Sequence, residues 1–198
     1  SWKADLLLTG SRGRRGISRV VLGSVSHSLL MAVGCSVRIV RGVKLARPYV
    51  QRVLVALDDS QYSKQVVSVI TSRPWADGAQ FRLVTSVPTL AQYMQEGQTQ
   101  SQDVGPLKIA RDDHLEAALA SLESTSADVR DKVKNIEVDF KVIDGDPREA
   151  IVDEAERWGA RLIITGCKGK NWIERLFVGS VSESIATWAN CSVEVVKN

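Results

Sequence analysis

The sequence contains few of the residues that build metal centres and disulfide frameworks. It has two histidines, His27 and His114, and three cysteines in 198 residues. The cysteines, Cys35, Cys167 and Cys191, do not follow the spacing of a disulfide or zinc motif. This pattern argues against a disulfide-rich secreted domain and suits a reducing compartment, so we expect a cytoplasmic protein.

Long apolar runs are also absent. No stretch approaches the roughly 18 apolar residues that a membrane span requires, so we expect no membrane partner. Hydrophobic residues nevertheless make up 44% of the chain, which is enough for a substantial core.

Charge is distributed unevenly along the chain. Residues 1–50 contain nine lysines and arginines but only one acidic residue, Asp5, whereas the remainder is net acidic. A basic segment can attract nucleic acid. However, aromatic residues that would stack on bases are not interleaved with these charges. We therefore disfavour nucleic acid and expect Arg12, Arg14 and Arg15 to lie in a polyphosphate-binding loop, with the other basic side chains solvated.

A glycine pattern occurs twice with the same spacing. Gly10 and Gly13 are followed after nine residues by Gly23-Ser24, and Gly166 and Gly169 are followed after nine residues by Gly179-Ser180. Each copy follows an apolar run and precedes an amphipathic segment. This order predicts a strand, a glycine loop and a helix start, an arrangement that presents backbone amides to phosphate.

The duplication extends beyond the glycines. When the chain is shifted by 156 residues, residues 2–41 align with residues 158–197 without a gap. A shared period of this length indicates tandem domains. The second copy is preceded by about 110 residues of globular sequence and the first copy by one residue, so we expect the chain to begin inside its first domain. The expected division is a partial domain at 1–42, a linker at 43–51 and a complete domain at 52–198.

Strand and helix patterns alternate in the longer part. Apolar runs predict strands, and helical spacing with caps such as Ser60 and Asp146-Pro147 predicts the helices between them. We expect residues 88–106 to form mostly a mobile loop. The order predicts an α/β fold with a doubly wound, mostly parallel five-stranded sheet of Rossmann-like type, plus the strand-helix-strand part of a second copy. The expected strands are 52–57, 81–87, 138–143, 161–165 and 193–196, and the expected helices are 61–73, 107–133, 147–158 and 181–189.

These motifs resemble the universal stress protein family in its tandem-domain form. ATP-binding members share the glycine spacing of both copies, and the segment from Val55 to Ser60 is similar to the family's first strand and adenine-side acidic residue. The resemblance implies a nucleotide-responsive stress or signalling module that binds ATP, with Mg²⁺ as an option through the phosphates. It also implies that Asp58 faces the adenine or ribose, with backbone near Ala56 and Val87 completing the base pocket.

The residue chemistry of the glycine loops supports a phosphate site. Glycine lets the main chain approach phosphate, a helix start favours anions, and hydroxyl and ammonium groups donate to phosphate oxygens. The predicted phosphate-side residues of the second copy are Gly166, Lys168, Gly169, Gly179, Ser180, Val181 and Ser182. Their equivalents in the first copy are Gly10, Arg12, Gly13, Gly23, Ser24, Val25 and Ser26, which we expect to form a weaker site.

Other functions remain open on the sequence. One alternative is that the glycines only make tight turns, in which case the protein would be a dimerising scaffold that binds no nucleotide. A third option is a slow ATPase or autokinase. No P-loop motif is present, and two histidines do not suggest a Ser-His-Asp set. Asp58 and Asp59 could hold Mg²⁺ but are more typical of a helix cap, and cationic neighbours would lower the pKa of Cys167.

The last strands of the two copies also predict an assembly. In the resembled family these strands pair antiparallel, which would make the chain a pseudo-dimer, with a homodimer as a further option. We expect residues 37–40 to pair with 193–196. Arg38 would then face the position of Glu194, so the two charges would offset each other.

Overall fold

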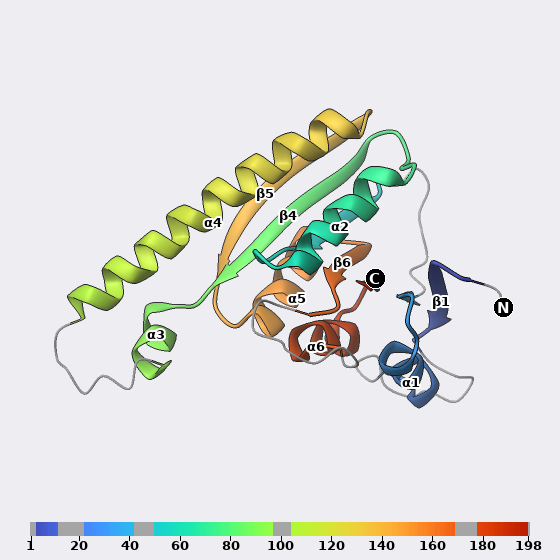
Figure 1. Cartoon of the computed structure of the whole chain (residues 1–198), viewed down its shortest axis with the longest axis horizontal. Coiled ribbons are helices and arrows are strands. Elements are labelled where there is room, and N and C mark those ends of the chain that lie inside the picture. The colour runs from blue at the N-terminus through green and yellow to red at the C-terminus, as the bar shows by residue number, and fades with distance from the viewer. Residues whose placement is uncertain (1–2, 12–21, 42–49, 97–103, 169–177, 198) are drawn as a thin grey trace.

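The computed structural model describes residues 3–11, 22–41, 50–96, 104–168 and 178–197 (Figure 1). Its strands form one sheet in the order β1-β2-β7-β6-β3-β4-β5. The strands are β1 (Leu6–Gly10), β2 (Ser36–Val40), β3 (Arg52–Ala56), β4 (Ala79–Val87), β5 (Ile136–Asp144), β6 (Leu162–Gly166) and β7 (Ser192–Val196). The helices are α1 (Ser24–Ala32), α2 (Gln61–Ser72), α3 (Leu90–Glu96), α4 (Gly105–Lys132), α5 (Pro147–Trp158) and α6 (Ser180–Trp188).

Neighbouring strands are parallel throughout the sheet except for β2 and β7. The parallel part β5-β4-β3-β6-β7 is the predicted doubly wound five-stranded sheet, and β1-α1-β2 adds a strand-helix-strand unit at its edge. β4 and β5 are longer than predicted because their pairing continues from Ala79 opposite Ile136 to Val87 opposite Asp144.

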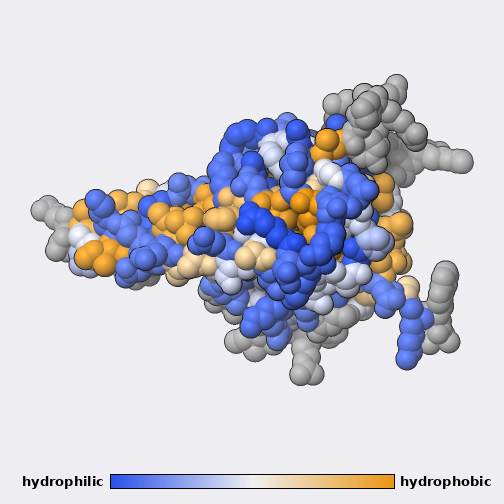
Figure 2. Space-filling view, turned by 90° about the horizontal axis from the view of Figure 1, so that it is seen from above, coloured by the Kyte–Doolittle hydropathy of each residue, from blue (hydrophilic) through white to orange (hydrophobic). Residues whose placement is uncertain are grey.

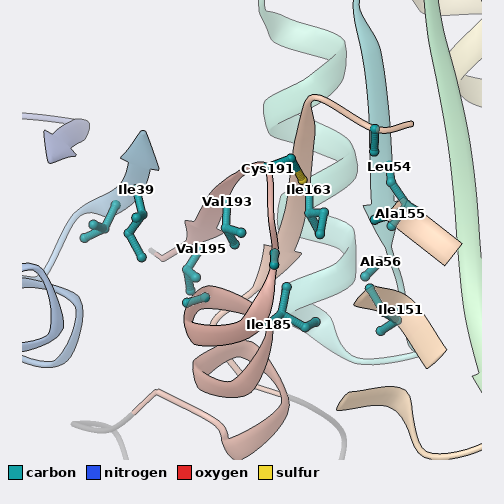
Figure 3. Packing of buried hydrophobic residues seen from close by; sticks show 14 of the residues in the cluster. Ile39, Leu54, Ala56, Ile151, Ala155, Ile163, Ile185, Cys191, Val193 and Val195 are labelled. Carbon is teal, nitrogen blue, oxygen red and sulfur yellow. The ribbon is translucent and has the colours of Figure 1, made fainter. Parts of the chain in front are cut away.

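Each face of the sheet is covered by helices. Along β3 the side chains alternate: Leu54 and Ala56 join one buried cluster, and Val53 and Val55 join the other. The first cluster includes residues of α5 and α6 (Figure 3) and Leu30 of α1, whereas the second includes residues of α2 and α4. This period of two explains why a strand buried on both faces reads as a continuous apolar run.

The antiparallel pairing of β2 with β7 confirms the predicted strand contact. Val37 lies opposite Val195, Arg38 opposite Glu194, and Ile39 opposite Val193. Ile39, Val193 and Val195 are fully buried in the same cluster (Figure 3). The hydrophobic core therefore continues from the β1-α1-β2 unit into the rest of the molecule.

Two arginines of the basic N-terminal part have structural partners: the predicted pairing of Arg38 with Glu194 is confirmed, whereas the expectation that Arg41 is solvated is wrong. Arg38 donates from Nη2 to Glu194 Oε2 over 2.5 Å. Arg41 is only 8% exposed and donates to the carbonyl oxygens of Ala186 and Cys191 over 2.5 and 3.2 Å. The carbonyls at the end of a helix lack partners within that helix, and here a distant arginine supplies the donors.

The expected loop at 88–106 contains the helix α3. Thr89 and Gln92 form a reciprocal cap: the Gln92 amide donates to Thr89 Oγ1 over 3.3 Å, and the Thr89 amide donates to Gln92 Oε1 over 2.8 Å. A hydrogen bond of 2.6 Å between Tyr93 Oη and His114 Nδ1 joins α3 to α4. Together α3 and the N-terminal half of α4 extend away from the sheet (Figure 1), and this arm carries exposed apolar residues (Figure 2).

The cap predicted at the start of α5 is present. Asp146 Oδ1 accepts a hydrogen bond from the Arg148 amide over 2.8 Å, and Pro147 occupies the first helical position. The Asp146 side chain therefore caps the helix through the amide of the second helical residue.

A buried carboxylate connects α5 with two strands. Glu154 is 1% exposed and accepts hydrogen bonds of 2.9 Å from Arg82 and Lys141, as well as a contact from Arg157. Burial by itself raises the pKa of Glu154, but the hydrogen bonds from Lys141 and Arg82 and the charge of Arg157 outweigh it. The pKa of Glu154 in the folded protein therefore lies below its ordinary value.

Glu154→Gln should therefore lower the free energy of unfolding at pH 7 by about 2 kcal/mol, the scale of a hydrogen bond to a charged group. Because the pKa is lowered on folding, the ionised carboxylate stabilises the fold above its unfolded pKa. That stabilisation is lost as the pH falls through the folded pKa. Urea unfolding at pH 7, 5 and 3 should show that the difference in unfolding free energy between the variant and the wild type becomes smaller as the pH falls. The exposed Glu156→Gln serves as control, and an equal effect of the two variants would contradict the assignment.

Candidate functional site

The strand order reverses at β3. From β3 the chain continues outward to β4 and β5 and then crosses to β6 and β7 on the other side. β3 is parallel to both neighbours, so the carboxyl ends of β3, β4 and β6 lie at one edge. Crevices at such reversals are where open α/β sheets bind ligands.

A cleft of about 360 Å³ lies at this edge, within the size range of small-molecule sites. Parts of six elements meet there: the ends of β3, β4 and β6 and the first turns of α2, α5 and α6. The lining residues are Ala56, Leu57, Asp58, Ser63, Thr85, Ser86, Pro147, Ile151, Thr165, Gly166, Lys168, Gly179, Ser180, Val181 and Ser182.

Asp58 is fixed at the carboxyl end of β3 by the start of α2. Its Oδ1 accepts hydrogen bonds from Ser60 Oγ over 2.5 Å and Ser63 Oγ over 2.7 Å, and Ser60 also caps the helix. The neighbouring Asp59 points elsewhere, since its Oδ1 accepts from Ser121 Oγ of α4 over 3.2 Å. The two carboxylates therefore have different partners, and within the described ranges no group of three or more metal-binding side chains is present.

The described ends of the second glycine loop lie on the opposite wall of the cleft. The Gly179 amide donates to the Cys167 carbonyl over 2.6 Å, and Ser182 Oγ donates to the Gly166 carbonyl over 2.5 Å. These bonds place the N-terminus of α6 beside the end of β6. Ser182 is buried and its hydroxyl hydrogen is used inside the protein, whereas Ser180 is exposed. The free amides of the first turn and the positive end of the helix dipole therefore face the cleft.

Lys168 supplies a cation to this wall. It lines the cleft while being only 7% exposed, and no hydrogen bond or ion pair of its ammonium is found among the described residues. A lysine in this position can form a charge-assisted contact with an anion. Gly169, which follows it, lies outside the described residues, as do Arg12 and Gly13 of the first copy.

The remaining wall is apolar. Ala56 and Ile151 lie beside each other at the end of β3 and in α5 (Figure 3). Val87, predicted near the base, is fully buried in β4 and is not among the lining residues; its carbonyl accepts from the Gly145 amide over 3.0 Å. Pro147 and Ile151 were not predicted as site residues. The Asp146-Pro147 motif predicts where a helix begins, but it does not show at which edge of the sheet that helix begins.

Gly166 has a packing role that the glycine pattern did not reveal. A Cβ atom at this position would lie 2.8 Å from the Cβ of Tyr62 in α2. Because Gly166 has no side chain, the end of β6 that lines the cleft can approach α2 closely.

The first glycine loop repeats the hydrogen bonds of the second. The Gly23 amide donates to the Ser11 carbonyl over 2.9 Å, and Ser26 Oγ donates to the Gly10 carbonyl over 2.5 Å. Ser24 and Val25 begin α1, but Val25 is 70% exposed, whereas its equivalent Val181 lines the cleft. In the described part, β1 is an edge strand with no counterpart of β3 beside it.

The expectation that the pKa of Cys167 is lowered is wrong. Burial raises the pKa of the Cys167 thiol, and the positive charge of Lys168 offsets this only in part. Burial also raises the pKa of Cys191 to about 11. The sequence showed the cationic neighbours of Cys167 but not its desolvation.

The architecture and cleft define a doubly wound α/β protein with a ligand crevice at its strand reversal. Comparison with known proteins identifies the group: the profile of the Universal stress protein family matches residues 1–41 and 50–197, and the chain belongs to this family. None of the helices in the described ranges has the length and apolar character that a membrane span requires.

Three relatives illustrate the match. A universal stress protein of Mycolicibacterium smegmatis is 29% identical over 198 residues, which are 100% of this chain and 63% of the relative. A universal stress protein structure from Archaeoglobus fulgidus has a TM-score of 0.60 at 22% identity, covering 98% of this chain and 61% of that one. A universal stress protein in complex with cAMP has a TM-score of 0.51 at 20% identity, covering 75% and 97%. The chain thus spans less than two thirds of the first two proteins.

Gly166→Ala should lower the free energy of unfolding by about 1–3 kcal/mol, as expected for overpacking against Tyr62. Gly34→Ala is the matched control, because a Cβ there meets nothing within 4 Å. Denaturant titration of both variants measures the difference. Equal stability of the two variants would show that β6 and α2 tolerate the added methyl group.

Cys167 and Cys191 should react slowly with iodoacetamide at pH 8, because both thiols are buried and have raised pKa values. The half-buried Cys35 should react first, and all three should react at similar rates in denaturant. Mass spectrometry of the labelled peptides gives the order. Labelling of Cys167 as fast as Cys35 in the folded protein would contradict the raised pKa.

Proposed function

We propose that the protein binds ATP in the cleft at the end of β3 and acts as a nucleotide-responsive stress or signalling module. The observation that carries this proposal is the convergence of a helix N-terminus, Lys168 and an apolar wall at one strand reversal. Any Mg²⁺ would be associated with the phosphates. A reducing cytoplasm is the proposed location, consistent with three free cysteines.

The phosphates would lie against the α6 side of the cleft. The first-turn amides of α6, the exposed hydroxyl of Ser180 and the ammonium of Lys168 are donors suited to phosphate oxygens. Gly166, Val181 and Ser182 shape this wall, the last through its hydrogen bond to the Gly166 carbonyl.

The adenosine would lie against the β3 and α5 side. Ala56 and Ile151 offer an apolar surface for the base, and Asp58 offers a carboxylate to ribose or base hydrogens. The reported complex of a related universal stress protein with cAMP supports an adenine nucleotide as the ligand class.

The tandem organisation is part of the proposal. The family profile matches in two stretches, and the Archaeoglobus fulgidus structure aligns with nearly the whole chain inside a single longer chain. These matches support a partial first domain at 1–42, a linker at 43–51 and a complete domain at 52–198 joined as a pseudo-dimer. The continuous core across β2 and β7 favours one alternative function, a dimerisation scaffold, which would share this assembly without binding nucleotide.

Within the described residues, no arrangement of side chains favours catalysis. His27 contacts Glu183, and His114 contacts Tyr93, so both histidines have partners outside the cleft lining. Slow ATP hydrolysis or autophosphorylation therefore remains only the alternative that the sequence left open.

Calorimetry should show that ATP binds more tightly than adenosine, since most donors in the cleft address the phosphates. Lys168→Ala should weaken ATP binding about tenfold, the scale of one charge-assisted hydrogen bond, and leave adenosine binding unchanged. Arg12→Ala, at the equivalent position of the first copy, is the matched control and should not alter binding in this cleft. Equal affinity for adenosine and ATP would contradict the assignment of the α6 side to the phosphates, and no ATP binding by a folded wild-type protein would support the scaffold instead.

A further inference from the structure

Two kinds of contact between the two copies can be distinguished when the repeat of 156 residues is applied. The first kind occurs twice, once in each direction. Arg41 donates to the carbonyl of Ala186, and its equivalent Lys197 donates to the carbonyl of Leu30, each over 2.5 Å. The Arg41 amide donates to Ser192 Oγ, and the Lys197 amide donates to Ser36 Oγ, each over 3.1 Å. We call these the reciprocal contacts.

The second kind joins a residue to its own repeat equivalent. His27 Nε2 contacts Glu183 Oε1 over 2.9 Å, and Arg38 contacts Glu194 over 2.5 Å; both pairs are 156 residues apart. A residue that meets its own equivalent lies on the pseudo-twofold axis, so we call these the axis contacts. The strand register agrees, because Val37 and Ile39 face Val195 and Val193 symmetrically about Arg38 and Glu194.

The two kinds of contact differ in what they would do between identical copies. The reciprocal contacts use serine in both copies and a basic residue in both, so they would persist if β7 paired with β7 of a second chain. The axis contacts would not persist, because in a symmetric pair of identical copies each axis residue meets itself. Glu194 would then face Glu194, and Arg38 would face Arg38.

We infer that the axis charges select the partner of the β7 edge: a copy with a basic axis residue, as in β2, and not a second copy of the C-terminal repeat. When the two residues at such an axis carry opposite charges, pairing of two identical copies would place like charges in contact, which disfavours that pairing. The reciprocal contacts hold the two copies together, and the axis contacts decide which copies meet.

Burial makes Arg38 and Glu194 the dominant axis pair. The Glu194 side chain is 0% exposed and that of Arg38 is 26% exposed, whereas His27 and Glu183 are 44% and 39% exposed and contribute less. Arg73 also binds Glu194, through Oε1 over 2.7 Å. Arg73 directly follows α2 in the same copy as Glu194, so it accompanies Glu194 in either arrangement and does not discriminate between partners.

The test uses the full chain and keeps an opposite-charge pair at positions 73 and 194 in every variant. Arg38→Glu gives both copies a negative axis residue. R73E/E194R gives both a positive axis residue and inverts the Arg73 pair. The triple variant R38E/R73E/E194R inverts all three charges and restores complementarity within the chain. R41K/K197R, which exchanges the reciprocal cations, is the matched control.

Hydrogen exchange of residues 36–40 and sedimentation mass are the readouts. We expect Arg38→Glu and R73E/E194R each to lose protection of β2 at least tenfold, and the triple variant and control to behave as wild type. Mixing the two mismatched chains should restore protection and give a complex of one copy of each, with twice the wild-type mass, because each chain then supplies the charge that the other needs.

Three results would overturn the inference. Wild-type protection of β2 in both mismatched chains would mean that the axis charges do not select. Self-association of either mismatched chain as strongly as the mixture would mean that identical copies pair equally well. Failure of both the mixture and the triple variant to recover protection would assign the loss to damaged folding rather than to partner choice.

Discussion

The parallel pairing of β3 with β6 is the contact on which the cleft depends. It joins segments more than one hundred residues apart in sequence, with Leu54 opposite Ile163 and Ala56 opposite Thr165. Because the strands are parallel, the loop after β3 and the glycine loop after β6 emerge at the same edge. Asp58 and the start of α6 are thereby brought to one crevice, and the helices α2 and α5 that bury the two faces also complete its walls.

A second contact determines how far the sheet extends. Pairing of β2 with β7 adds the β1-α1-β2 unit through a shared core, reciprocal helix-end contacts and the buried Glu194. A buried carboxylate is weak evidence for stability, because its desolvation offsets much of its attraction to arginine. Its placement on the pseudo-twofold axis gives it a different physical role, that of distinguishing one partner strand from another.

The strands and the phosphate side of the cleft were predictable because they depend on local patterns, whereas Ala56 and Asp58 were expected from the family resemblance. Apolar runs such as 52–56 and caps at Ser60 and Asp146 report the local structure directly. The helix α3 was missed although Thr89 and Gln92 form a recognisable capping pair, because the glutamine-rich composition suggested a loop. The raised pKa of Cys167 and the contact of Gly166 with Tyr62 depend on burial and on a distant helix, which no local pattern reports.

Hydrogen exchange with and without ATP tests most directly whether the β3 and β6 loops form one nucleotide site. The account predicts that ATP slows exchange in residues 57–63 and in 166–168 together with 179–183, and that residues 23–27 of the first glycine loop change little. Protection of only one of the two loops, or protection at 23–27 in place of the cleft, would contradict it.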